Sequence, residues 1–456
     1  MSGLKMCVST QTPLVQFDMG ERARGRGEGE SPVVDLESLV EGKEYRYTPG
    51  GVTRMVFPLL RHMLRSGMLT SVDWTSLNPT APSIARIGGI MLRSVAIEKS
   101  RMAGYGKAKE AILAAMSGIA SGGADDDIFW SDDFTDYAYY NRQTAELVSA
   151  LDRENDFDVF YIHDFQQLPL GHMLHSLKPK IFRWHIPFDE SVIPSEWKEP
   201  LGTYLNSYDV VIASSMKYLS SLRRFGYSGK ARHVYPYVDP TDYSVPSMGE
   251  VDSLCRGLGL AKQDKVALVV ARMDPMKGQD RAIRALAKAR KEERRLKLVL
   301  VGNGSFSSSK AGVGLSKGAA WRSELELLAK KLGLKESVVF AGHLSHGGLD
   351  AAYERCDLTL LPSVREGFGL VVLESWIHKK PSIVSRGAGI SELVADGVNG
   401  FLYDPDDCDG LAERMLTLVS DTRRGRLMGE RGFSTSKRCY IDEGVKAESD
   451  VIAGVV

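Results

Sequence analysis

The feature that most constrains the fold of this chain is a regular alternation of short apolar runs with longer amphipathic stretches. Short apolar runs are typical of buried strands, and apolar residues spaced three and four apart are typical of helices. Strands that alternate with helices indicate a parallel, doubly wound sheet. In the first half we expect strands at 5–10, 72–76, 158–163, 180–184 and 209–213, and helices at 52–65, 137–151 and 218–225.

The alternation starts afresh after the segment 235–240 (YPYVDP), whose two prolines restrict the backbone and end regular structure. A length of 456 residues also exceeds what one ordinary core accommodates. We therefore expect two domains, at 1–238 and 239–435, with the segment 436–456 packing back toward the first. The expected elements of the second half are strands at 265–271, 296–301, 337–341, 358–362 and 381–385, and helices at 280–293, 321–334 and 369–378.

Two segments differ from this pattern, because 20–32 and 303–318 are rich in glycine, serine and charged residues. Such composition is typical of surface loops without a packed core, and we expect both segments to be mobile. The first segment is either a lid on one side of a substrate site or a solvated insertion without function.

The charge balance excludes several classes of function. Lys and Arg together number 58, Asp and Glu also number 58, and the net charge is zero. No global basic field therefore exists to attract nucleic acid or an anionic membrane, so any anion binding must be local. The five cysteines form no C-x-x-C pair, and no apolar run is long enough for a secretion signal or a membrane span. We expect a soluble, cytoplasmic protein without disulfides or a zinc site.

The motif that carries most chemistry is the segment 364–374 (VREGFGLVVLE), where an expected strand runs through a glycine-containing loop into a helix. Gly367 and Gly369 allow backbone N–H groups to approach a ligand, and a helix N-terminus attracts negative charge, which suits a diphosphate. Glu366 and Glu374 accept hydrogen bonds from hydroxyl pairs, as sugar rings offer. The alternatives are a solvated loop charge for Glu366 and an acid on the helix surface for Glu374.

Two cations follow the first strand of the second half, in the segment 271–278 (ARMDPMKG). Ligands of open α/β sheets bind at the carboxyl ends of the strands, where Arg272 and Lys277 are expected. A guanidinium and an ammonium at one spot would neutralise a leaving diphosphate. The alternative is a pair of solvated cations beside a proline turn.

The first half has three weaker signals. Gly50 and Gly51 precede an apolar helix, where they would let the backbone approach phosphates closely. The segments 163–167 (HDFQQ) and 183–187 (RWHIP) place polar residues at the ends of two expected strands. His185 could donate or accept a hydrogen bond with a sugar hydroxyl, although a lone histidine is as often structural.

These motifs together resemble the retaining glycosyltransferases of family 4. Glu366 and Glu374 match the E-x7-E signature of that family, and the segments 387–392 (GAGISE) and 397–402 (GVNGFL) also have its form. The resemblance covers nearly the whole chain and implies the GT-B fold, in which two Rossmann-like doubly wound domains flank a cleft. Within the family, segments 163–166, 183–186, 236–240 and 272–277 look most like the trehalose glycosyltransferring synthases and trehalose phosphorylases.

The resemblance also implies a role for each matching position. Arg272 and Lys277 would hold the donor diphosphate and Glu374 the ribose. Glu366 and His185 would contact the transferred sugar. The remaining positions, with their expected neighbours in parentheses, are Gly51 (phosphates), Gly369, Leu370 and Val371 (backbone at the diphosphate), His343 and Leu344 (base) and Asp164 (acceptor).

The expected activity is that of a retaining hexosyltransferase that moves a glucosyl group from a nucleoside-diphosphate sugar to a sugar acceptor, with trehalose as the candidate product. No spacing marks a carboxylate nucleophile, so we expect transfer on one face of the sugar. The expected partners are these two small molecules. A homodimer is left open, no cofactor is required, and Mg²⁺ is not needed by the fold, although stimulation by a metal is left open. The alternatives are a trehalose-type phosphorylase, a non-catalytic sugar-nucleotide-binding protein and a hexosamine epimerase on the same fold.

Overall fold

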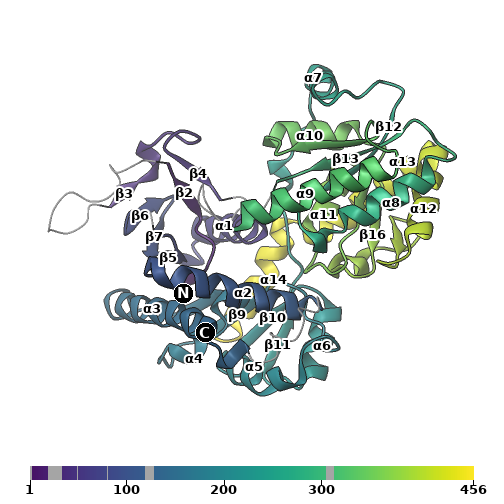
Figure 1. Ribbon diagram of the computed structural model, residues 1–456. Coiled ribbons are helices and arrows are strands. Elements are labelled where there is room, and N and C mark those ends of the chain that lie inside the picture. Colours follow the sequence, from purple (N-terminus) through teal and green to yellow (C-terminus); the bar gives the residue numbers. More distant parts are fainter. Residues whose placement is uncertain (1–2, 19–32, 49, 80, 119–127, 304–312) are drawn as a thin grey trace. The chain divides into compact units, whose positions relative to one another are not determined.

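The computed structural model describes residues 3–18, 33–48, 50–79, 81–118, 128–303 and 313–456 (Figure 1). The chain divides into two compact units. Unit 1 comprises Met1–Pro236 together with Asp442–Val456, and unit 2 comprises Tyr237–Ile441. Each unit is built on a mostly parallel sheet with helices packed against it, which makes the protein a mixed α/β protein with two Rossmann-like domains.

Unit 1 contains a sheet in the order β11-β10-β9-β8-β1-β5-β7-β6-β3, in which only β6 runs antiparallel to its partner β7 among the described strands. The strands of this sheet are β1 (Leu4–Thr10), β3 (Val34–Asp35), β5 (Leu69–Leu77), β6 (Ile84–Ile87), β7 (Ile90–Val95), β8 (Val159–His163), β9 (Lys180–Trp184), β10 (Val210–Ala213) and β11 (Lys230–His233). A separate antiparallel pair is formed by β2 (Val15–Phe17) and β4 (Tyr45–Tyr47).

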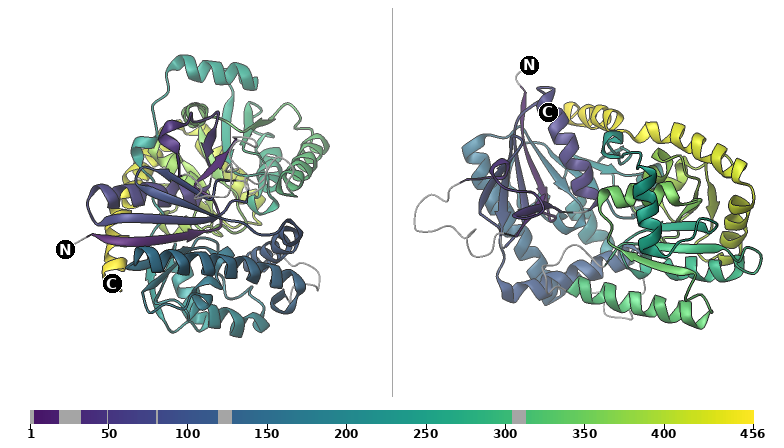
Figure 2. Two further views of the ribbon diagram at one scale, coloured as in Figure 1. Left: turned by 90° about the vertical axis from the view of Figure 1, so that its left-hand side faces the viewer. Right: turned by 90° about the horizontal axis from the view of Figure 1, so that it is seen from above.

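The helices of unit 1 cover this sheet; they are α1 (Gly51–Arg65), α2 (Met102–Met116), α3 (Asp132–Asn155), α4 (Leu170–Met173), α5 (Lys198–Leu205), α6 (Met216–Phe225) and α14 (Ile441–Ala453). Helices α2 and α3 lie side by side, and α3 contacts β5 and β7 (Figure 2). The start of α3 is fixed by Ser131, whose hydroxyl accepts a hydrogen bond from the N–H of Phe134, with two aspartates in the first turn.

Unit 2 contains a fully parallel sheet in the order β14-β13-β12-β15-β16-β17. Its strands are β12 (Lys265–Val270), β13 (Leu296–Val301), β14 (Val338–Gly342), β15 (Leu358–Leu361), β16 (Ser382–Ser385) and β17 (Phe401–Tyr403). Its helices are α7 (Met248–Leu258), α8 (Gln279–Ala289), α9 (Val313–Lys331), α10 (His346–Arg355), α11 (Leu370–Ile377), α12 (Cys408–Ser420) and α13 (Thr422–Ser436). Helices α8 and α12 lie side by side (Figure 1).

In each sheet the chain crosses from one side of the first strand to the other. In unit 2 the chain passes from β12 to β13 and β14 on one side, and then returns to place β15 on the other side of β12. In unit 1 the chain likewise places β5 on one side of β1 and later β8 on the other. At such a switch point the two neighbouring connections leave the sheet in opposite directions, which opens a crevice at the carboxyl ends of the strands.

Every expected strand and helix has a counterpart, but the helix expected at 321–334 begins eight residues earlier, at Val313, and one loop prediction was therefore wrong. The segment 20–32 lies outside the described residues, as does 304–312. Residues 313–318 were expected in a loop and instead begin helix α9. Once the buried Leu325 and Ala329 hold the helix, extending it costs less than starting a new one, even through weak helix formers such as glycine.

Among the described residues, no helix combines the length and the apolar character that a membrane crossing demands.

Candidate functional site

In unit 2 the predicted residues gather at the carboxyl ends of β12 and β15, the switch point of the sheet. The loop after β12 forms a short 3-10 turn, Pro275–Lys277, in which the Asp274 carboxylate accepts a hydrogen bond from the N–H of Met276. The carbonyl of Met276 in turn accepts a hydrogen bond of 2.9 Å from the N–H of Val364, in the loop after β15. The two loops are therefore tied together by their backbones.

Gly278 makes this close approach sterically allowed. Its φ of +66° lies in the left-handed region, and a Cβ atom added there would sit 2.0 Å from the carbonyl oxygen of Pro362. No side chain fits at that distance, so only glycine allows the β12 loop to lie against the end of β15.

Lys277 and Glu366 form an ion pair across these two loops, with 2.5 Å between Nζ and Oε2. The Ser363 hydroxyl donates a hydrogen bond of 3.1 Å to the same carboxylate oxygen. Only about a fifth of either charged side chain is exposed (19% and 20%). The alternative of a solvated loop charge for Glu366 is therefore wrong.

The backbone of Glu366 is fixed by a third loop, the one that follows β16. Its N–H donates to the carbonyl of Gly387, and its own carbonyl accepts from the N–H of Gly389. A Cβ atom on Gly389 would come within 2.5 Å of the Gly367 carbonyl oxygen, so this approach also requires glycine. Three consecutive strand ends thus hold the Glu366 carboxylate in one position.

Electrostatics keep Glu366 ionised. Burial by itself raises the pKa of this carboxyl, but the charge and hydrogen bond of Lys277, with smaller contributions from Ser363 and Arg272, outweigh burial. The pKa of Glu366 therefore lies below its ordinary value. Arg272 itself pairs weakly with Asp274, at 3.6 Å, and about a third of its side chain is exposed.

Helix α11 begins directly after the Glu366 loop. Its cap, Gly369, has φ +113°, and a Cβ atom there would come within 2.6 Å of the Leu361 side chain. Leu370 and Val371 form the first turn, where helix N–H groups have no acceptor within the helix and attract anions. The residues predicted to hold a diphosphate by their backbone therefore do begin a helix at this edge of the sheet.

Glu374 is buried within α11, with 2% of its surface exposed, so the alternative of an acid on the helix surface is wrong. The hydroxyl of Tyr353, on α10, donates a hydrogen bond of 2.8 Å to Oε2 of Glu374. Tyr353 stacks on His378 with ring centroids 5.1 Å apart, and His378 lies 3.1 Å from the Asp350 carboxylate. A row of buried polar side chains thus holds this carboxylate from behind.

His343 and Leu344 follow β14, two strands away from β12 on the same edge of the sheet. The preceding Gly342 accepts a hydrogen bond from the N–H of Gly302 at 2.7 Å, which joins the ends of β13 and β14. His343 is exposed and Leu344 is half-buried.

In unit 1 the predicted residues gather at the carboxyl ends of β8 and β9. Nδ1 of His163 lies 3.1 Å from Nε2 of His185, and the Asp164 carboxylate accepts a hydrogen bond of 3.2 Å from the backbone N–H of His185. Gly51 is the first residue of α1, which leads into β5. Because β5 is parallel to β1 and β8, the start of α1 is at the same edge of the sheet.

Asp164 is both strained and buried. Its φ of +67° and ψ of 164° lie in a region that residues other than glycine rarely adopt, and such strain concentrates at functional sites. Burial raises the pKa of Asp164 to about 6, although backbone N–H groups of Phe165, His185 and Ile186 oppose the rise.

Sequence reasoning missed a buried ion pair beneath these residues. Arg183 on β9 pairs with Glu448 on α14, both side chains are fully buried, and Tyr161 donates a hydrogen bond of 2.7 Å to the same carboxylate. The arginine within the apolar strand 180–184 was a signal for a buried acidic partner, but nothing in the sequence indicates which acid it is. Tyr353 was missed for the same reason.

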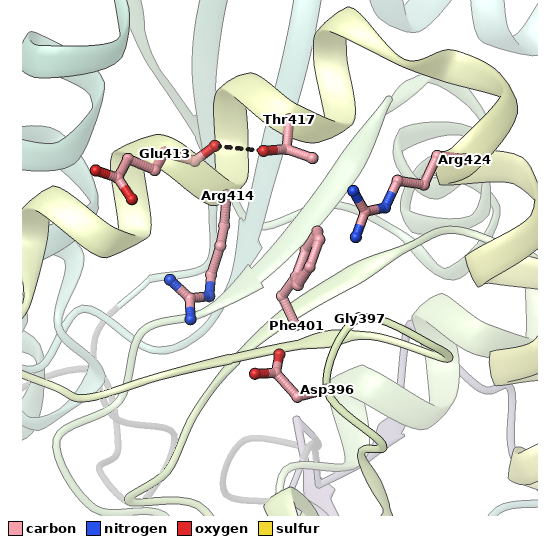
Figure 3. A pocket seen from close by; sticks show the side chains of 7 residues that line it. All are labelled: Asp396, Gly397, Phe401, Glu413, Arg414, Thr417 and Arg424. Atoms are coloured by element: carbon pink, nitrogen blue, oxygen red, sulfur yellow. Dashed lines mark hydrogen bonds between the residues drawn. The ribbon is translucent and has the colours of Figure 1, made fainter.

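A hollow of about 290 Å³ also occurs in unit 2 (Figure 3). Gly397 and Phe401, from the segment 397–402, line it, but none of the residues to which a ligand contact was assigned does. Phe401 lies between the guanidinium groups of Arg414 and Arg424, at 6.0 and 5.0 Å from its ring centre. Asp396 and Glu413 balance the two charges. Because the arginines already engage the aromatic ring and the lining is neutral overall, we do not assign ligand chemistry to this hollow.

Two family models match the chain. Residues 252–435 match the model described as glycosyl transferases group 1, and residues 120–220 match the model described as trehalose synthase, N-terminal domain. The first range contains the unit 2 residues described above, and the second contains His163, Asp164, Arg183 and His185.

Curated relatives agree with these models. An uncharacterized glycosyltransferase of Methanocaldococcus jannaschii is 25% identical over 63% of this chain and 73% of its own length. D-inositol 3-phosphate glycosyltransferase 2 of Catenulispora acidiphila is 29% identical over 62% of this chain and 65% of its own. A GDP-mannose-dependent phosphatidylinositol monomannoside mannosyltransferase of Mycolicibacterium smegmatis is 30% identical over 46% of this chain and 52% of its own.

Solved structures show the same fold at low identity. The α,α-trehalose 6-phosphate synthase of Burkholderia multivorans aligns with a TM-score of 0.74 at 18% identity, over 100% of this chain and 97% of that chain. The sucrose-phosphate synthase of Thermosynechococcus elongatus aligns with a TM-score of 0.70 at 17% identity, over 99% and 98%.

Proposed function

We propose that this chain is a retaining hexosyltransferase of family 4, that is, a group 1 glycosyltransferase of GT-B fold with a trehalose synthase-type N-terminal domain. Its donor is a nucleoside-diphosphate sugar, with glucose as the transferred sugar, and its acceptor is a second sugar. The product we propose is trehalose or a close relative of it.

One observation carries the proposal: the ionised Glu366 is locked to Lys277 at the switch point of the unit 2 sheet. A nucleotide sugar needs cations for its diphosphate and a fixed carboxylate for its hydroxyl groups, and both occur there. Arg272 lies on the same loop as Lys277, and the start of α11 adds backbone N–H donors. Glu374 is proposed to accept hydrogen bonds from the ribose, and His343 and Leu344 to contact the base.

The proposed reaction proceeds on one face of the sugar. The bond between the anomeric carbon and the phosphate oxygen breaks through an oxocarbenium-like state, and the acceptor hydroxyl forms the new bond on the same side. The leaving phosphate oxygen takes the proton of that hydroxyl. Arg272 and Lys277 stabilise the charge that grows on the leaving diphosphate, which lowers the barrier rather than merely tightening binding.

The unit 1 residues are proposed to serve the two sugars. His185 contacts the transferred sugar, Asp164 the acceptor, and the start of α1 at Gly51 the phosphates. The trehalose assignment rests on the match of residues 120–220, which contains both His185 and Asp164. We propose that the reaction needs no resident metal or cofactor, Mg²⁺ included, and that the protein acts in the cytoplasm.

The test is an incubation of purified protein with a panel of UDP-, ADP- and GDP-sugars and free sugars, followed by identification of product and released nucleotide. A disaccharide with retained configuration, formed equally with and without EDTA, supports the proposal. Product formed only from a sugar 1-phosphate, or from a disaccharide and inorganic phosphate, identifies a phosphorylase instead. Tight nucleotide binding without turnover of any donor identifies a non-catalytic binding protein.

A further inference from the structure

The pairing of two histidines in unit 1 limits where their protons can be. His163, the last residue of β8, is fully buried, and its Nδ1 lies 3.1 Å from Nε2 of His185, just after β9. The two rings stack with centroids 5.4 Å apart and planes 25° apart. A hydrogen bond at this distance needs one proton between the two nitrogens, so one ring donates and the other accepts.

The remaining nitrogen of His163 decides which ring donates. Nε2 of His163 is buried and has no hydrogen-bond partner among the described residues. If His185 were the donor, His163 would carry its own proton on Nε2, which would be a buried N–H without an acceptor. If His163 is the donor, Nε2 carries only a lone pair. Orphaned buried N–H groups are rarer in proteins than under-satisfied acceptors, so the second arrangement is favoured.

A positively charged histidine carries a proton on both ring nitrogens, so the tautomer is defined only for neutral rings. Both rings are held neutral here. Burial lowers the pKa of His163 well below its ordinary value, and the charge of Arg183 lowers it further. Burial likewise lowers the pKa of His185, with His163 and Arg183 acting in the same direction. Two neutral rings share two protons, and one of these lies between the rings.

We propose that His163 donates from Nδ1 to Nε2 of His185 and so fixes His185 in the tautomer that carries its proton on Nδ1. His185 is half-buried, and its Nδ1 makes no hydrogen bond within the described part of the chain. The fixed tautomer presents an N–H donor to an oxygen of the bound ligand. His163 is thus a positioning residue, in the way that the partner of one imidazole nitrogen sets the state of the other.

Both histidines are held in place for this role. The backbone N–H of His185 donates to the Asp164 carboxylate, which fixes the base of the ring. The Tyr161 ring lies 4.2 Å from the His163 ring, centroid to centroid, and its hydroxyl is bound to the buried Glu448. The identity of the ligand oxygen as a sugar hydroxyl rests on the proposed function, whereas the tautomer does not.

The first test reads the tautomer directly in the ligand-free protein. Long-range ¹H–¹⁵N correlation spectra of ¹⁵N-histidine-labelled protein distinguish a protonated from an unprotonated ring nitrogen, and the spectrum of His185→Gln assigns the signals among the nine histidines. We expect His185 protonated on Nδ1 in the wild type, and a mixture or the Nε2–H form in His163→Phe. A wild-type His185 protonated on Nε2, or an unchanged tautomer in His163→Phe, overturns the proposal.

The second test replaces His163 by one residue that keeps a hydrogen-bond donor and by another that lacks it. Asn at position 163 retains an amide N–H near the place of Nδ1, so His163→Asn should keep the tautomer and most of the turnover. His163→Phe should lose about tenfold, the value of one neutral hydrogen bond. A set of sugar nucleotides that each lack one hydroxyl of the sugar extends this test. With one of them, turnover by the wild type should be about tenfold lower than with the intact sugar nucleotide, whereas turnover by His163→Phe should be the same with both. Additive losses for every such donor, or equal losses in the Asn and Phe variants, would assign His163 a purely structural role.

The two proposals fail in distinguishable ways. If no sugar nucleotide is turned over, the proposed function fails, while the spectra still report the tautomer. If transfer occurs but His185 carries its proton on Nε2, only this inference fails. Circular dichroism and thermal melting of His163→Phe and His163→Asn exclude variants that do not fold.

Discussion

At the scale of single residues, the Lys277–Glu366 pair couples two roles. Removing the Lys277 ammonium would take away a cation from the proposed diphosphate site and would also leave a mostly buried carboxylate without its nearest partner. We expect Lys277→Ala and Arg272→Ala each to lower turnover on the order of a hundredfold, as removal of one transition-state contact does in other enzymes. Steady-state kinetics with the donor identified by the panel measures this.

The matched control is Lys335→Ala, a lysine of the same unit that is exposed and lies between α9 and β14. Its turnover should equal that of the wild type. Near-normal turnover in Arg272→Ala would remove Arg272 from the mechanism.

Tyr353 offers a second prediction, because its hydroxyl holds the buried Glu374 carboxylate. Tyr353→Phe keeps the stacking on His378 but removes this hydrogen bond, so Glu374 should bind the ribose less well. We expect the donor KM to rise about three- to tenfold with kcat nearly unchanged, because a typical hydrogen bond contributes about 1 kcal/mol to binding. Isothermal titration with a nucleoside diphosphate and with its 2′,3′-dideoxy analogue provides the check, since the variant should bind the two with more similar affinities. If the variant discriminates against the dideoxy analogue as strongly as the wild type does, Tyr353 has no role in ribose recognition.

Asp164 gives a prediction about pH. Its pKa is about 6 in the folded protein against an ordinary value of 3.8, so the folded state holds this proton more tightly than the unfolded state does. The contribution of Asp164 to stability is therefore complete below about pH 4 and is lost as pH rises toward 6, by roughly 3 kcal/mol. Asn does not titrate, so Asp164→Asn should gain stability relative to the wild type over this range. Urea unfolding of both proteins between pH 4 and 7 measures the difference, and parallel stability profiles would contradict it.

The individual site residues that the sequence identified are those marked by local spacing. Glu366, Glu374, Arg272 and Lys277 stand beside glycine or proline turns at strand ends, so their position on the sheet edge follows from the order of elements. Their partners do not follow, because Tyr353 on α10 and Glu448 on α14 meet them only through the tertiary fold. Buried pairs between residues far apart in the chain leave no periodic signal. The roles of the site residues stay predictions until they are tested by substitution.

At the scale of elements, strands and helices with a strong apolar period were predicted well, whereas the end of α9 nearest residues 304–312 was not. Glycine-rich composition at 313–318 suggested a loop, and the helix extends through it because its later turns are anchored in the core. The hairpin of β6 and β7 was also missed, since its short strands flank the two adjacent glycines 88 and 89 with little alternation. At such places tertiary packing, and not local composition, determines the secondary structure.

The contact between the β12 and β15 loops gives a prediction at this scale. Gly278→Ala would force a Cβ atom against the Pro362 carbonyl and would push Lys277 away from Glu366. We expect a fall in thermal stability together with a loss of donor binding. Gly333→Ala is the matched control, because Gly333 also has positive φ (+71°) but nothing lies within 4 Å of an added Cβ. Gly333→Ala should cost only the conformational strain, about 1 kcal/mol, and should leave donor binding intact. Equal effects of the two substitutions on donor binding would show that the Pro362 contact does not position Lys277.

At the scale of the whole molecule, unit 1 is discontinuous in sequence. It is formed by the N-terminal part of the chain and by α14, which follows all of unit 2. Unit 1 is therefore complete only after α14 has been synthesised. Glu448 on α14 supplies the buried carboxylate for Arg183 on β9, so the guanidinium lacks this carboxylate until α14 has docked.

This dependence predicts that removing one member of the ion pair costs more stability than replacing both members by apolar residues. Glu448→Ala leaves the Arg183 guanidinium buried without its carboxylate and removes the acceptor of the Tyr161 hydroxyl, so it should cost about 3–5 kcal/mol. The double variant Arg183→Met with Glu448→Leu replaces both charges by apolar groups of similar size, and buried ion pairs replaced in this way lose little stability. It should therefore be much more stable than Glu448→Ala.

Hydrogen exchange of the β8 and β9 amides reports the stability of unit 1, and exchange of the β12 and β13 amides provides the internal reference in unit 2. We expect faster exchange only in β8 and β9, with a large increase for Glu448→Ala and a small increase for the double variant, in which the Tyr161 hydroxyl still lacks its acceptor. If both variants are equally destabilised, the cost comes from lost packing of α14 and not from the unpaired charge.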